Sequence, residues 1–417
     1  MKYVIIGNSA AGIGAVEGIR QIDTQGEITI ISNEPHHTYS RPLISYLLLG
    51  KVTEAKMQYR SGNFYTDNNC ALLHASVTAI DAAARQVALA DGSRIPYDKL
   101  LIATGSSAFV PPFEGLDTVA DKCTFMSLDD AKKLDGLLGG GDKRVLIIGA
   151  GLIGLKCDEG IAQRASHITV LDLAPRILSS ILDEDGAKLV QSHLESKGIA
   201  FRLAVNITKF ESNVAILAGG ETIGFDVLVL AVGVRPNTAI LKDIATIDRG
   251  IVINGKSETS APNIYAAGDC TQTLDVSSGQ NRIMALLPNA YMQGECAGVN
   301  MAGGDKTFDR AIPMNAIGFF GLHIITAGNY SGDVYRGEEG DRGSGVGDRG
   351  KSYKRLFYSD NRLNGFILIG DVEKAGIYTS LIRERTPLDG IDFALVCEKP
   401  GLMAFTKEDR KVKLGGG

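Results

Sequence analysis

The stretch VIIGNSAAGIGAVEGIR, from Val4 to Arg20, decides the fold because it nearly repeats as VLIIGAGLIGLKCDEGI, from Val145 to Ile161. Each copy has an apolar run of strand length, a glycine turn and a helical pattern. A second apolar run follows each copy, EITIIS at 27–32 and HITVLD at 167–172. Such runs are typical of parallel strands that helices cover on both faces. The sequence therefore predicts a βαβ unit twice.

The glycine turn in each copy predicts a dinucleotide site. The first glycine permits a tight turn, a small middle residue lets the backbone approach a pyrophosphate, and the last lets helix pack on strand. The helix N-terminus then favours the anion. The second copy matches fully, whereas Ser9 takes the middle position of the first. The expected contacts are Gly7, Ser9, Ala10, Ala11 and Gly12 in one site, and Gly149, Gly151, Leu152, Ile153 and Gly154 in the other.

An acidic residue near the end of each second strand is expected to accept hydrogen bonds from a ribose diol. Glu34 and Asp172 stand at these points. Asp172 would also repel a 2′-phosphate, so we expect the second site to prefer NAD(H) over NADP(H).

Length and composition exclude several classes of protein. The 417 residues suggest two or three domains, and the formal charge of −5 argues against a nucleic-acid partner. No apolar run reaches the roughly 18 residues of a membrane span, and the first residues predict a strand rather than a signal peptide. Six scattered cysteines without a CxxC pair fit reduced thiols in the cytoplasm, and no metal site is predicted.

Three later segments resemble motifs of the FAD/NAD(P)-dependent pyridine nucleotide-disulphide oxidoreductases. KLLIATGS at 99–106 and DVLVLAVGVRPN at 226–237 resemble the linking motifs, and TSAPNIYAAGDC at 259–270 resembles the second FAD motif. The resemblance implies that FAD is the first nucleotide and that Asp269 accepts a hydrogen bond from its ribityl chain. Further implied cofactor contacts are Val77, Thr104, Gly105 and Gly233.

The segment ALLPNAYMQGECAGVNMAG, 285–303, resembles the family helix whose N-terminus faces the pyrimidine edge of the flavin. Its N–H groups would stabilise negative charge on the reduced ring, and Leu287 and Pro288 suit a helix start. An ordinary packing helix is the alternative.

The expected fold is α/β, with two Rossmann-like three-layer nucleotide-binding domains and a C-terminal α+β domain with an antiparallel sheet. We expect the FAD-binding domain at 1–108 and 231–305, the NAD-binding domain at 109–230 and the interface domain at 306–417. The segment 352–382 alternates as an antiparallel sheet does and resembles the C-terminal domain of the NADH:rubredoxin reductase and nitrite-reductase-like branch. The Gly- and charge-rich stretch 336–351 predicts a mobile surface loop.

The segment HHTYSRPLISYLLLGK, 36–51, lacks the redox cysteine that the disulphide reductases carry here. Its Tyr-Ser-Arg-Pro motif resembles the corresponding segment of ferredoxin and rubredoxin reductases. The resemblance implies that Arg41 and Pro42 contact FAD, with Arg41 on the pyrophosphate. A surface ion pair is the alternative for Arg41. His36 and His37 are open between acid-base and structural roles.

Those reductases usually place a lysine near flavin N5 and pair it with a glutamate just after the NAD glycine motif. Here Tyr46 takes the lysine position and Lys156 the glutamate position. We therefore expect the cation near N5 to have moved to Lys156, with Tyr46 beside it; the alternative is that Lys156 points to solvent. We expect Asp158 and Glu159 to be favoured by the helix dipole.

The leading functional hypothesis is an NAD(P)H:acceptor oxidoreductase. It would transfer a hydride between NAD(H) and FAD, and single electrons between FAD and an iron–sulphur carrier or partner subunit. A rubredoxin or ferredoxin would serve, as would a larger complex such as a tungsten aldehyde oxidoreductase. The alternatives are an NADH oxidase that reduces dioxygen and an NADH-switched flavin interaction module. The carrier, the direction of flow and the choice between homodimer and hetero-oligomer stay open.

Overall fold

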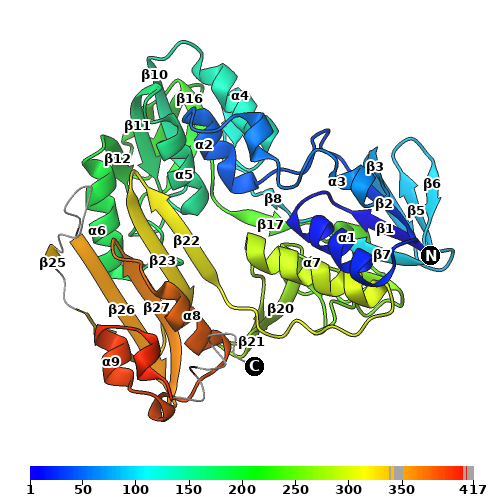
Figure 1. Ribbon diagram of the computed structural model, residues 1–417. Coiled ribbons are helices and arrows are strands. Elements are labelled where there is room, and N and C mark those ends of the chain that lie inside the picture. Colours follow the sequence, from blue (N-terminus) through cyan, green and yellow to red (C-terminus); the bar gives the residue numbers. More distant parts are fainter. Residues whose placement is uncertain (338–339, 342–350, 407–409, 411–417) are drawn as a thin grey trace. The chain divides into compact units, whose positions relative to one another are not determined.

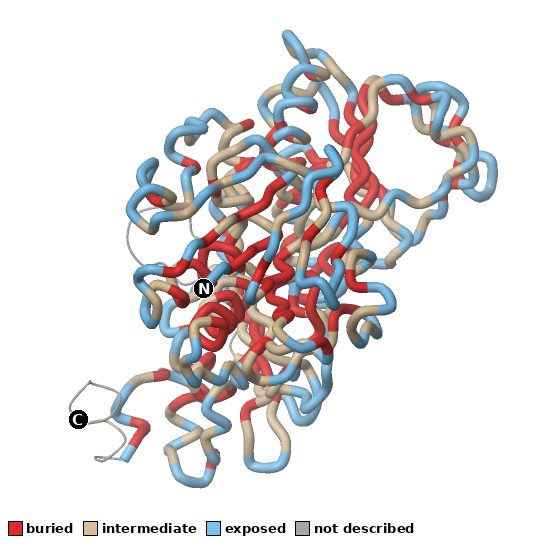
Figure 2. Tube along the Cα trace, turned by 90° about the vertical axis from the view of Figure 1, so that its right-hand side faces the viewer, coloured by how far each residue is buried: buried red, intermediate tan, exposed pale blue. Residues whose placement is uncertain are grey.

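The computed structural model describes residues 1–337, 340–341, 351–406 and 410 (Figure 1). The chain forms two compact units. The first unit comprises 1–175, 198–274 and 281–309, and the second unit comprises 176–197, 275–280 and 310–417. Buried stretches gather in the interior and exposed ones at the turns (Figure 2). Within the described ranges, we find no helix of the length and apolar character that crossing a membrane requires.

A five-stranded parallel sheet forms around the first βαβ unit. Its order is β19-β7-β1-β2-β3, with β1 at Lys2–Ile6 in the centre. The other strands are β2 (Glu27–Ser32), β3 (Cys70–His74), β7 (Lys99–Ile102) and β19 (Ile264–Ala266). The helix α1, Ala10–Ile22, follows β1 and buries nine of its residues, which include every residue from Ala10 to Val16. The first predicted unit is confirmed.

The helix α7, Leu287–Met301, packs on α1 through glycines (Figure 1). A Cβ added to Gly294 would lie 2.0 Å from the carbonyl oxygen of Ala11, and one added to Gly14 would lie 2.4 Å from that of Tyr291. Such distances are far below van der Waals contact. The two helix backbones can therefore approach this closely only because these positions lack side chains.

The second βαβ unit forms a second parallel sheet of order β12-β11-β10-β16-β9. Its strands are β9 (Lys122–Thr124), β10 (Lys143–Ile148), β11 (Ala165–Leu171), β12 (Ile199–Arg202) and β16 (Val227–Leu230). The helix α5, Leu152–Ile161, follows β10, and the short helix α2, Ile44–Leu48, packs against it.

Short elements complete the first unit. One antiparallel sheet contains β4 (Val77–Asp81), β5 (Gln86–Leu89) and β6 (Arg94–Pro96). A second contains β13 (Ile207–Glu211), β14 (Val214–Leu217) and β15 (Thr222–Gly224). A third pairs β8 (Ser106–Ala108) with β17 (Val234–Pro236). The helices α3 (Phe64–Asp67) and α4 (Leu128–Leu138) also lie here. Three further strands are β18 (Ile251–Val252), β20 (Thr271–Asp275) and β21 (Gln280–Arg282), of which Asp275 and Gln280 are counted with the second unit.

The second unit contains the predicted antiparallel sheet, in the order β22-β23-β27-β26-β24 with β25 paired to β26. The strands are β22 (Met314–Phe319), β23 (Leu322–Gly328), β24 (Asp333–Arg336), β25 (Gly340–Asp341), β26 (Lys351–Ser359) and β27 (Arg362–Ile369). Its helices are α6 (Glu184–Glu195), α8 (Ala375–Arg383) and α9 (Phe393–Glu398). The predicted α/β class with a C-terminal antiparallel sheet is confirmed. Most of the predicted surface loop, residues 338–339 and 342–350, lies outside the described residues.

Candidate functional site

The first glycine turn is shaped as a pyrophosphate cradle would be. Gly7 has a φ of +122°, and a Cβ there would lie 2.1 Å from the carbonyl oxygen of Ala103. A Cβ on Gly12 would lie 2.1 Å from the carbonyl oxygen of Gly7. The helix α1 begins at Ala10, and the side chain of Ser9 makes no capping bond to it. Because the first N–H groups of a helix lack intrahelical partners, this end is suited to an anion.

In the second glycine turn, close packing explains two of the three glycines but not the middle one. Gly149 has a φ of +114°, and Cβ atoms on Gly149 and Gly154 would lie 2.2 and 1.9 Å from backbone carbonyl oxygens. A Cβ on Gly151 would meet no described atom within 4 Å. Packing therefore explains the first and third glycines but not the middle one. The site fits a dinucleotide whose pyrophosphate approaches the backbone at Gly151.

Asp172 and Glu34 lie where the sequence predicts, close to the turns. Asp172 follows β11, and its carboxylate accepts hydrogen bonds from the backbone N–H groups of Ala150 (2.6 Å) and Ala174 (2.8 Å). A carboxylate has about four lone-pair positions, so two remain for a ribose diol. Glu34 accepts a hydrogen bond from the hydroxyl of Tyr39 (2.7 Å) and forms an ion pair with Arg41.

Arg41 lies at the start of the 3-10 helix Arg41–Leu43, with Pro42 directly after it. Besides the ion pair with Glu34, its guanidinium carbon lies 5.2 Å from the centre of the Tyr39 ring. Arg41 therefore does form the ion pair that we considered as an alternative. A guanidinium has five donors, so that pair leaves donors for a phosphate, and the expected pyrophosphate contact stays a prediction.

The second FAD motif meets the first glycine turn and α7. The Ser106 hydroxyl donates to Asp269 (3.3 Å), and burial raises the pKa of the Asp269 carboxyl. The neighbouring Gly268 has a φ of +85°, and a Cβ there would lie 3.2 Å from the Cβ of Ala11 and 3.4 Å from that of Ala290. Asp269 is thereby positioned between the turn that begins α1 and the helix that begins at Leu287 and Pro288.

Three further predicted cofactor residues, Thr104, Gly105 and Gly233, lie on the segments that lead into and out of the second sheet. Thr104 donates to the carbonyl oxygen of Asn237 (2.7 Å), and the Asn237 amide donates back to that of Thr104 (2.9 Å). Gly105 and Gly233 have φ values of +64° and +110°, in the left-handed region that favours glycine. Val77 is the first residue of β4 and packs against a hydrophobic cluster on one side of the first sheet.

The two predicted catalytic residues lie together. Where α2 packs on α5, the Lys156 ammonium lies 4.6 Å from the centre of the Tyr46 ring and forms an ion pair with Glu159. The Lys156 side chain is only 15% exposed, so it does not simply point to solvent. Sequence reasoning missed Glu159 as its partner. Opposite charges three positions apart on a helix were the available signal.

Asp158 and Glu159 are not explained by the helix dipole, and that interpretation is wrong. Both lie in the second half of α5, whereas the dipole effect is confined to the first turn. Asp158 is fully buried, and neither carboxyl oxygen has a hydrogen-bond partner among the described residues. Burial raises the pKa of Asp158 well above its ordinary value.

The two histidines have structural contacts. His36 Nε2 lies 2.8 Å from a carboxylate oxygen of Asp129. His37 Nδ1 lies 3.0 Å from the carbonyl oxygen of Thr38, and its ring packs edge-on against that of Tyr65.

Cys270, beside Asp269, is buried, and burial raises the pKa of its thiol to about 11. This thiol is therefore protonated at neutral pH.

Two family models match the chain. The model described as pyridine nucleotide-disulphide oxidoreductase matches residues 1–294. The model described as rubredoxin NAD+ reductase C-terminal domain matches residues 313–386.

Two individual relatives and one solved structure are also similar to this chain over most of its length. The NADH-dependent phenylglyoxylate dehydrogenase subunit epsilon of Aromatoleum evansii is 31% identical over 93% of this chain and 92% of its own length. An NADH oxidase of Methanocaldococcus jannaschii is 31% identical over 74% and 71%. The crystal structure of NADH:rubredoxin oxidoreductase from Clostridium acetobutylicum has a TM-score of 0.74 at 26% identity, covering 93% of this chain and 96% of that one.

Proposed function

The chain belongs to the pyridine nucleotide-disulphide oxidoreductase family, and we propose that it exchanges electrons between NAD(H) and an iron–sulphur protein or subunit. Membership makes it a flavoprotein oxidoreductase with FAD and NAD(H) as cofactors, as the sequence predicts. When bound, FAD supplies a ring that exchanges a hydride with NAD(H) and single electrons with one-electron carriers.

The observation that carries the proposal is the pair of glycine turns, each opening a helix, in a chain without the family's redox cysteine. Gly151 lacks a packing reason for its missing side chain, which supports a pyrophosphate at the second turn. The segment 36–51 has serine, arginine and proline where the disulphide reductases have a thiol. Electrons are therefore expected to leave without thiol chemistry.

The residues of the chain would bind and orient the cofactors. The turn from Gly7 to Gly12 and Arg41 would hold the FAD pyrophosphate, and Asp269 would hold its ribityl chain. The N-terminus of α7 would place N–H groups at the pyrimidine edge. The turn from Gly149 to Gly154 would hold NAD(H), and Asp172 would favour it over NADP(H) by repelling a 2′-phosphate.

Lys156 would supply fixed positive charge at the reacting end of the site. Its ammonium contacts the Tyr46 ring and forms an ion pair with Glu159. A cation held in a poorly solvated place stabilises charge that develops during transfer without having to reorganise. We propose that Lys156 replaces the lysine that the family pattern puts at the position of Tyr46.

Two comparisons support a protein acceptor. Residues 313–386 match the C-terminal domain of rubredoxin NAD+ reductases. The Aromatoleum relative, which the chain matches over almost its full length, is named as a subunit of an NADH-dependent dehydrogenase. We extend the proposal to an NAD-coupling subunit of a larger oxidoreductase, of which a tungsten aldehyde oxidoreductase would be one. Six free thiols support a cytoplasmic location.

A second candidate is an NADH oxidase, which the Methanocaldococcus relative favours. The distinguishing experiment compares acceptors at one NADH concentration. FAD-loaded protein is mixed anaerobically with NADH and a rubredoxin, a ferredoxin or a co-purifying iron–sulphur subunit, and oxygen consumption is followed separately.

We expect the best iron–sulphur acceptor to exceed dioxygen by at least about tenfold, equivalent to roughly 1.4 kcal/mol of barrier. Free FAD with the same acceptors is the control. Dioxygen reduction as fast as that of every carrier would replace our proposal with the oxidase. Failure of NADH to reduce the bound flavin would leave the non-catalytic, NADH-switched module.

A further inference from the structure

A buried amide on α7 contacts the turn that carries Asp269. Gln293 is 3% exposed, and its side-chain oxygen accepts a hydrogen bond from the backbone N–H of Gly268 (2.8 Å). The hydroxyl of Thr271 lies 3.1 Å from the same oxygen. Gly268 and Thr271 lie on either side of Asp269 and Cys270, so one glutamine side chain contacts both ends of the turn. The sequence did not predict Gln293 as a residue of the site.

The backbone N–H of Gly268 depends on this contact. Gly268 is buried, and among the described residues its N–H has no acceptor other than Gln293. A buried N–H group without an acceptor costs free energy, so the amide oxygen favours this shape of the turn. The turn is closed by Thr271, whose N–H donates to the carbonyl oxygen of Gly268 (2.9 Å). Asp269 lies inside this closed turn, and the position of its carboxyl group therefore depends on Gln293.

The next residue of α7 contacts the first turn of α1, and the two helices lie side by side (Figure 1). A Cβ on Gly294 would lie 2.0 Å from the carbonyl oxygen of Ala11. Two consecutive residues of α7, Gln293 and Gly294, thus contact the two segments that we expect to hold FAD. One is the helix that follows the first glycine turn, and the other is the turn at Asp269.

We propose that Gln293 is a positioning residue for the flavin. The inference rests on the proposed function, in which Asp269 holds the ribityl chain and the N-terminus of α7 faces the pyrimidine edge. Gln293 lies about 9 Å along the helix from Leu287, where α7 begins. Because it joins the helix to the Asp269 turn, it sets the spacing between these two groups without having to touch FAD.

This spacing matters most for reduced FAD. The N–H groups at a helix N-terminus stabilise negative charge, of which the reduced ring carries more than the oxidised ring. Their effect is confined to the first turn of the helix, so a small displacement of α7 weakens binding of the reduced form more than binding of the oxidised form. Such a displacement lowers the reduction potential of bound FAD. A general loss of folding stability weakens both forms equally and leaves the potential unchanged.

The test measures FAD affinity and reduction potential in Gln293→Met, which replaces the amide by an apolar chain of similar length. Full-length, FAD-loaded protein is equilibrated at decreasing FAD concentrations, and the loaded protein is titrated anaerobically against a reference dye. We expect FAD to bind at least about tenfold more weakly, since the turn loses its hydrogen bond to α7. The potential should fall, and a further tenfold loss by the reduced form corresponds to about 30 mV for two electrons.

Thr271→Val is a milder variant that keeps the test decisive where Gln293→Met does not fold. It removes only the hydroxyl beside the Gln293 oxygen and keeps the shape of the side chain. The same two measurements should change in the same direction, with FAD bound about threefold more weakly.

Asn300 provides the matched control on the same helix. It lies about two turns further along α7, is 7% exposed and donates to the carbonyl oxygens of Lys256 (3.1 Å) and Lys306 (2.7 Å). Asn300→Leu also removes a buried amide, but neither lysine is expected to contact FAD. This variant should unfold at a lower urea concentration, as Gln293→Met should, and keep the wild-type FAD affinity and potential.

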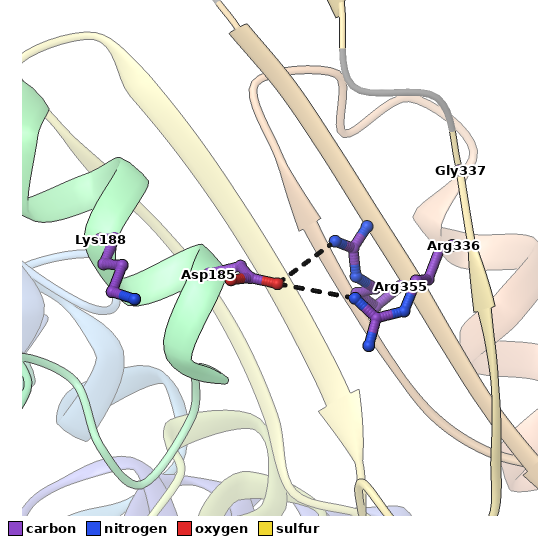
Figure 3. Close-up of a pocket in the computed structure, with 5 residues that line it drawn as sticks. All are labelled: Asp185, Lys188, Arg336, Gly337 and Arg355. Atoms are coloured by element: carbon purple, nitrogen blue, oxygen red, sulfur yellow. Dashed lines mark ion pairs between the residues drawn. The ribbon is translucent and has the colours of Figure 1, made fainter.

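A second control changes a charged group in the other unit. Asp185 of α6 faces Arg336 of β24 and Arg355 of β26, at 3.7 and 3.6 Å, and these residues line a cavity of about 480 Å³ (Figure 3). We expect none of the three to contact FAD. Asp185→Asn should therefore keep the wild-type affinity and potential.

Asp269→Ala separates this inference from the proposed function. Weak FAD binding in Asp269→Ala together with wild-type binding in Gln293→Met would overturn the positioning role alone. Wild-type binding in Asp269→Ala would overturn the ribityl contact and, with it, the positioning role. When the two changes are combined, we expect a smaller loss of affinity than the product of the single losses, because both act on one contact.

Three further results would overturn the positioning role of Gln293. The first is independent, multiplicative losses in the double variant Asp269→Ala/Gln293→Met. The second is a wild-type potential in Gln293→Met. The third is an equal loss of FAD affinity in Gln293→Met and in either control, Asn300→Leu or Asp185→Asn, since the effect would then follow from any destabilising change.

Discussion

At the scale of single residues, the contacts of Lys156 include an aromatic ring and a carboxylate. The Tyr46 ring offers a cation–π contact, commonly about 0.5–2 kcal/mol, and Glu159 offers an ion pair with little exposure to water. We predict that Lys156→Ala slows anaerobic flavin reduction by NADH about tenfold or more while NADH binding changes less, because fixed charge acts mainly on the transition state. Stopped-flow reduction at several NADH concentrations separates the two effects.

The control for this prediction concerns Glu159. Removing the lysine takes away the cation that pairs with a nearly buried carboxylate, which can destabilise a protein by itself. The double variant Lys156→Ala/Glu159→Gln removes that cost and should stay slow. Adding Tyr46→Lys should restore part of the rate. A double variant that reduces its flavin as fast as wild type would leave Lys156 with a structural role only.

Asp158 gives a second prediction, on stability rather than rate. Its buried carboxyl has a raised pKa, so the folded protein keeps this proton to higher pH than the unfolded chain, where an aspartate titrates near about 3.9. The contribution to stability is therefore full below that pH and is lost as the pH rises toward the folded pKa. Within this window, wild type should lose about 1.4 kcal/mol per pH unit relative to Asp158→Asn, which cannot titrate.

Urea unfolding of both proteins at pH 5 and pH 7 measures this difference. The asparagine amide also lacks partners, so the absolute stability of the variant at one pH is not the informative quantity. The informative quantity is how the gap between the two proteins changes with pH. Parallel curves for wild type and Asp158→Asn would mean that the folded protein ionises Asp158 normally.

At the scale of elements, the contact between α1 and α7 depends on missing side chains. We predict that Gly294→Ala lowers the free energy of unfolding by about 1–3 kcal/mol and weakens FAD retention, because its Cβ would lie 2.0 Å from the Ala11 carbonyl oxygen. The matched control is Gly136→Ala in α4, where a Cβ would meet no described atom within 4 Å. That variant should gain about 0.5–1 kcal/mol from helix propensity. Equal effects of the two substitutions would contradict close packing at Gly294.

The sequence predicts these elements better than it predicts their contacts. Both βαβ units and the start of α7 at Leu287 follow from apolar runs, glycine turns and a proline, all of which act locally. The short antiparallel sheets that flank the parallel ones carry weaker patterns and were missed. The pairing of Lys156 with Tyr46 depends on how α2 packs on α5, which no local pattern encodes.

The features of the candidate site likewise divide into those that local sequence signals predict and those that depend on tertiary packing. Glycine turns and terminal acids are local signals, so Gly7, Gly149, Glu34 and Asp172 could be placed from spacing alone. The difference between Gly149 and Gly151, one needed for packing and the other not, appears only when neighbouring backbone is present. The contact between Gln293 and the N–H of Gly268 depends on how α7 packs on the Asp269 turn, which the helical pattern does not determine by itself.

At the scale of the whole molecule, each of the two units contains hydrophobic clusters made of its own residues. In the first unit, one cluster lies around β1, α1 and α7, and a second lies on the opposite side of the sheet that contains β1. A third lies beside β10 and β16. In the second unit, β26, β27, α8 and α9 share another core. Every residue that we expect to contact FAD or NAD(H) lies in the first unit. Cofactor contacts should therefore stabilise the first unit directly.

We predict that hydrogen exchange will show this division when FAD-free and FAD-loaded proteins are compared. A ligand that binds only the folded state stabilises it by RT ln(1 + [L]/Kd), about 4 kcal/mol at a thousandfold excess over Kd. Amides of β1, α1 and the first turn of α7 should gain protection on FAD loading, because the glycine turn and Asp269 belong to these elements. Amides of β27 and α8 should exchange at unchanged rates, since their core contains none of the expected cofactor contacts. In Asp269→Ala the gain should shrink at the same FAD concentration, which ties it to the ribityl contact. Equal gains in β27 and α8 would mean that both cores unfold as one cooperative body, because only then would energy supplied to the first unit protect amides of the second.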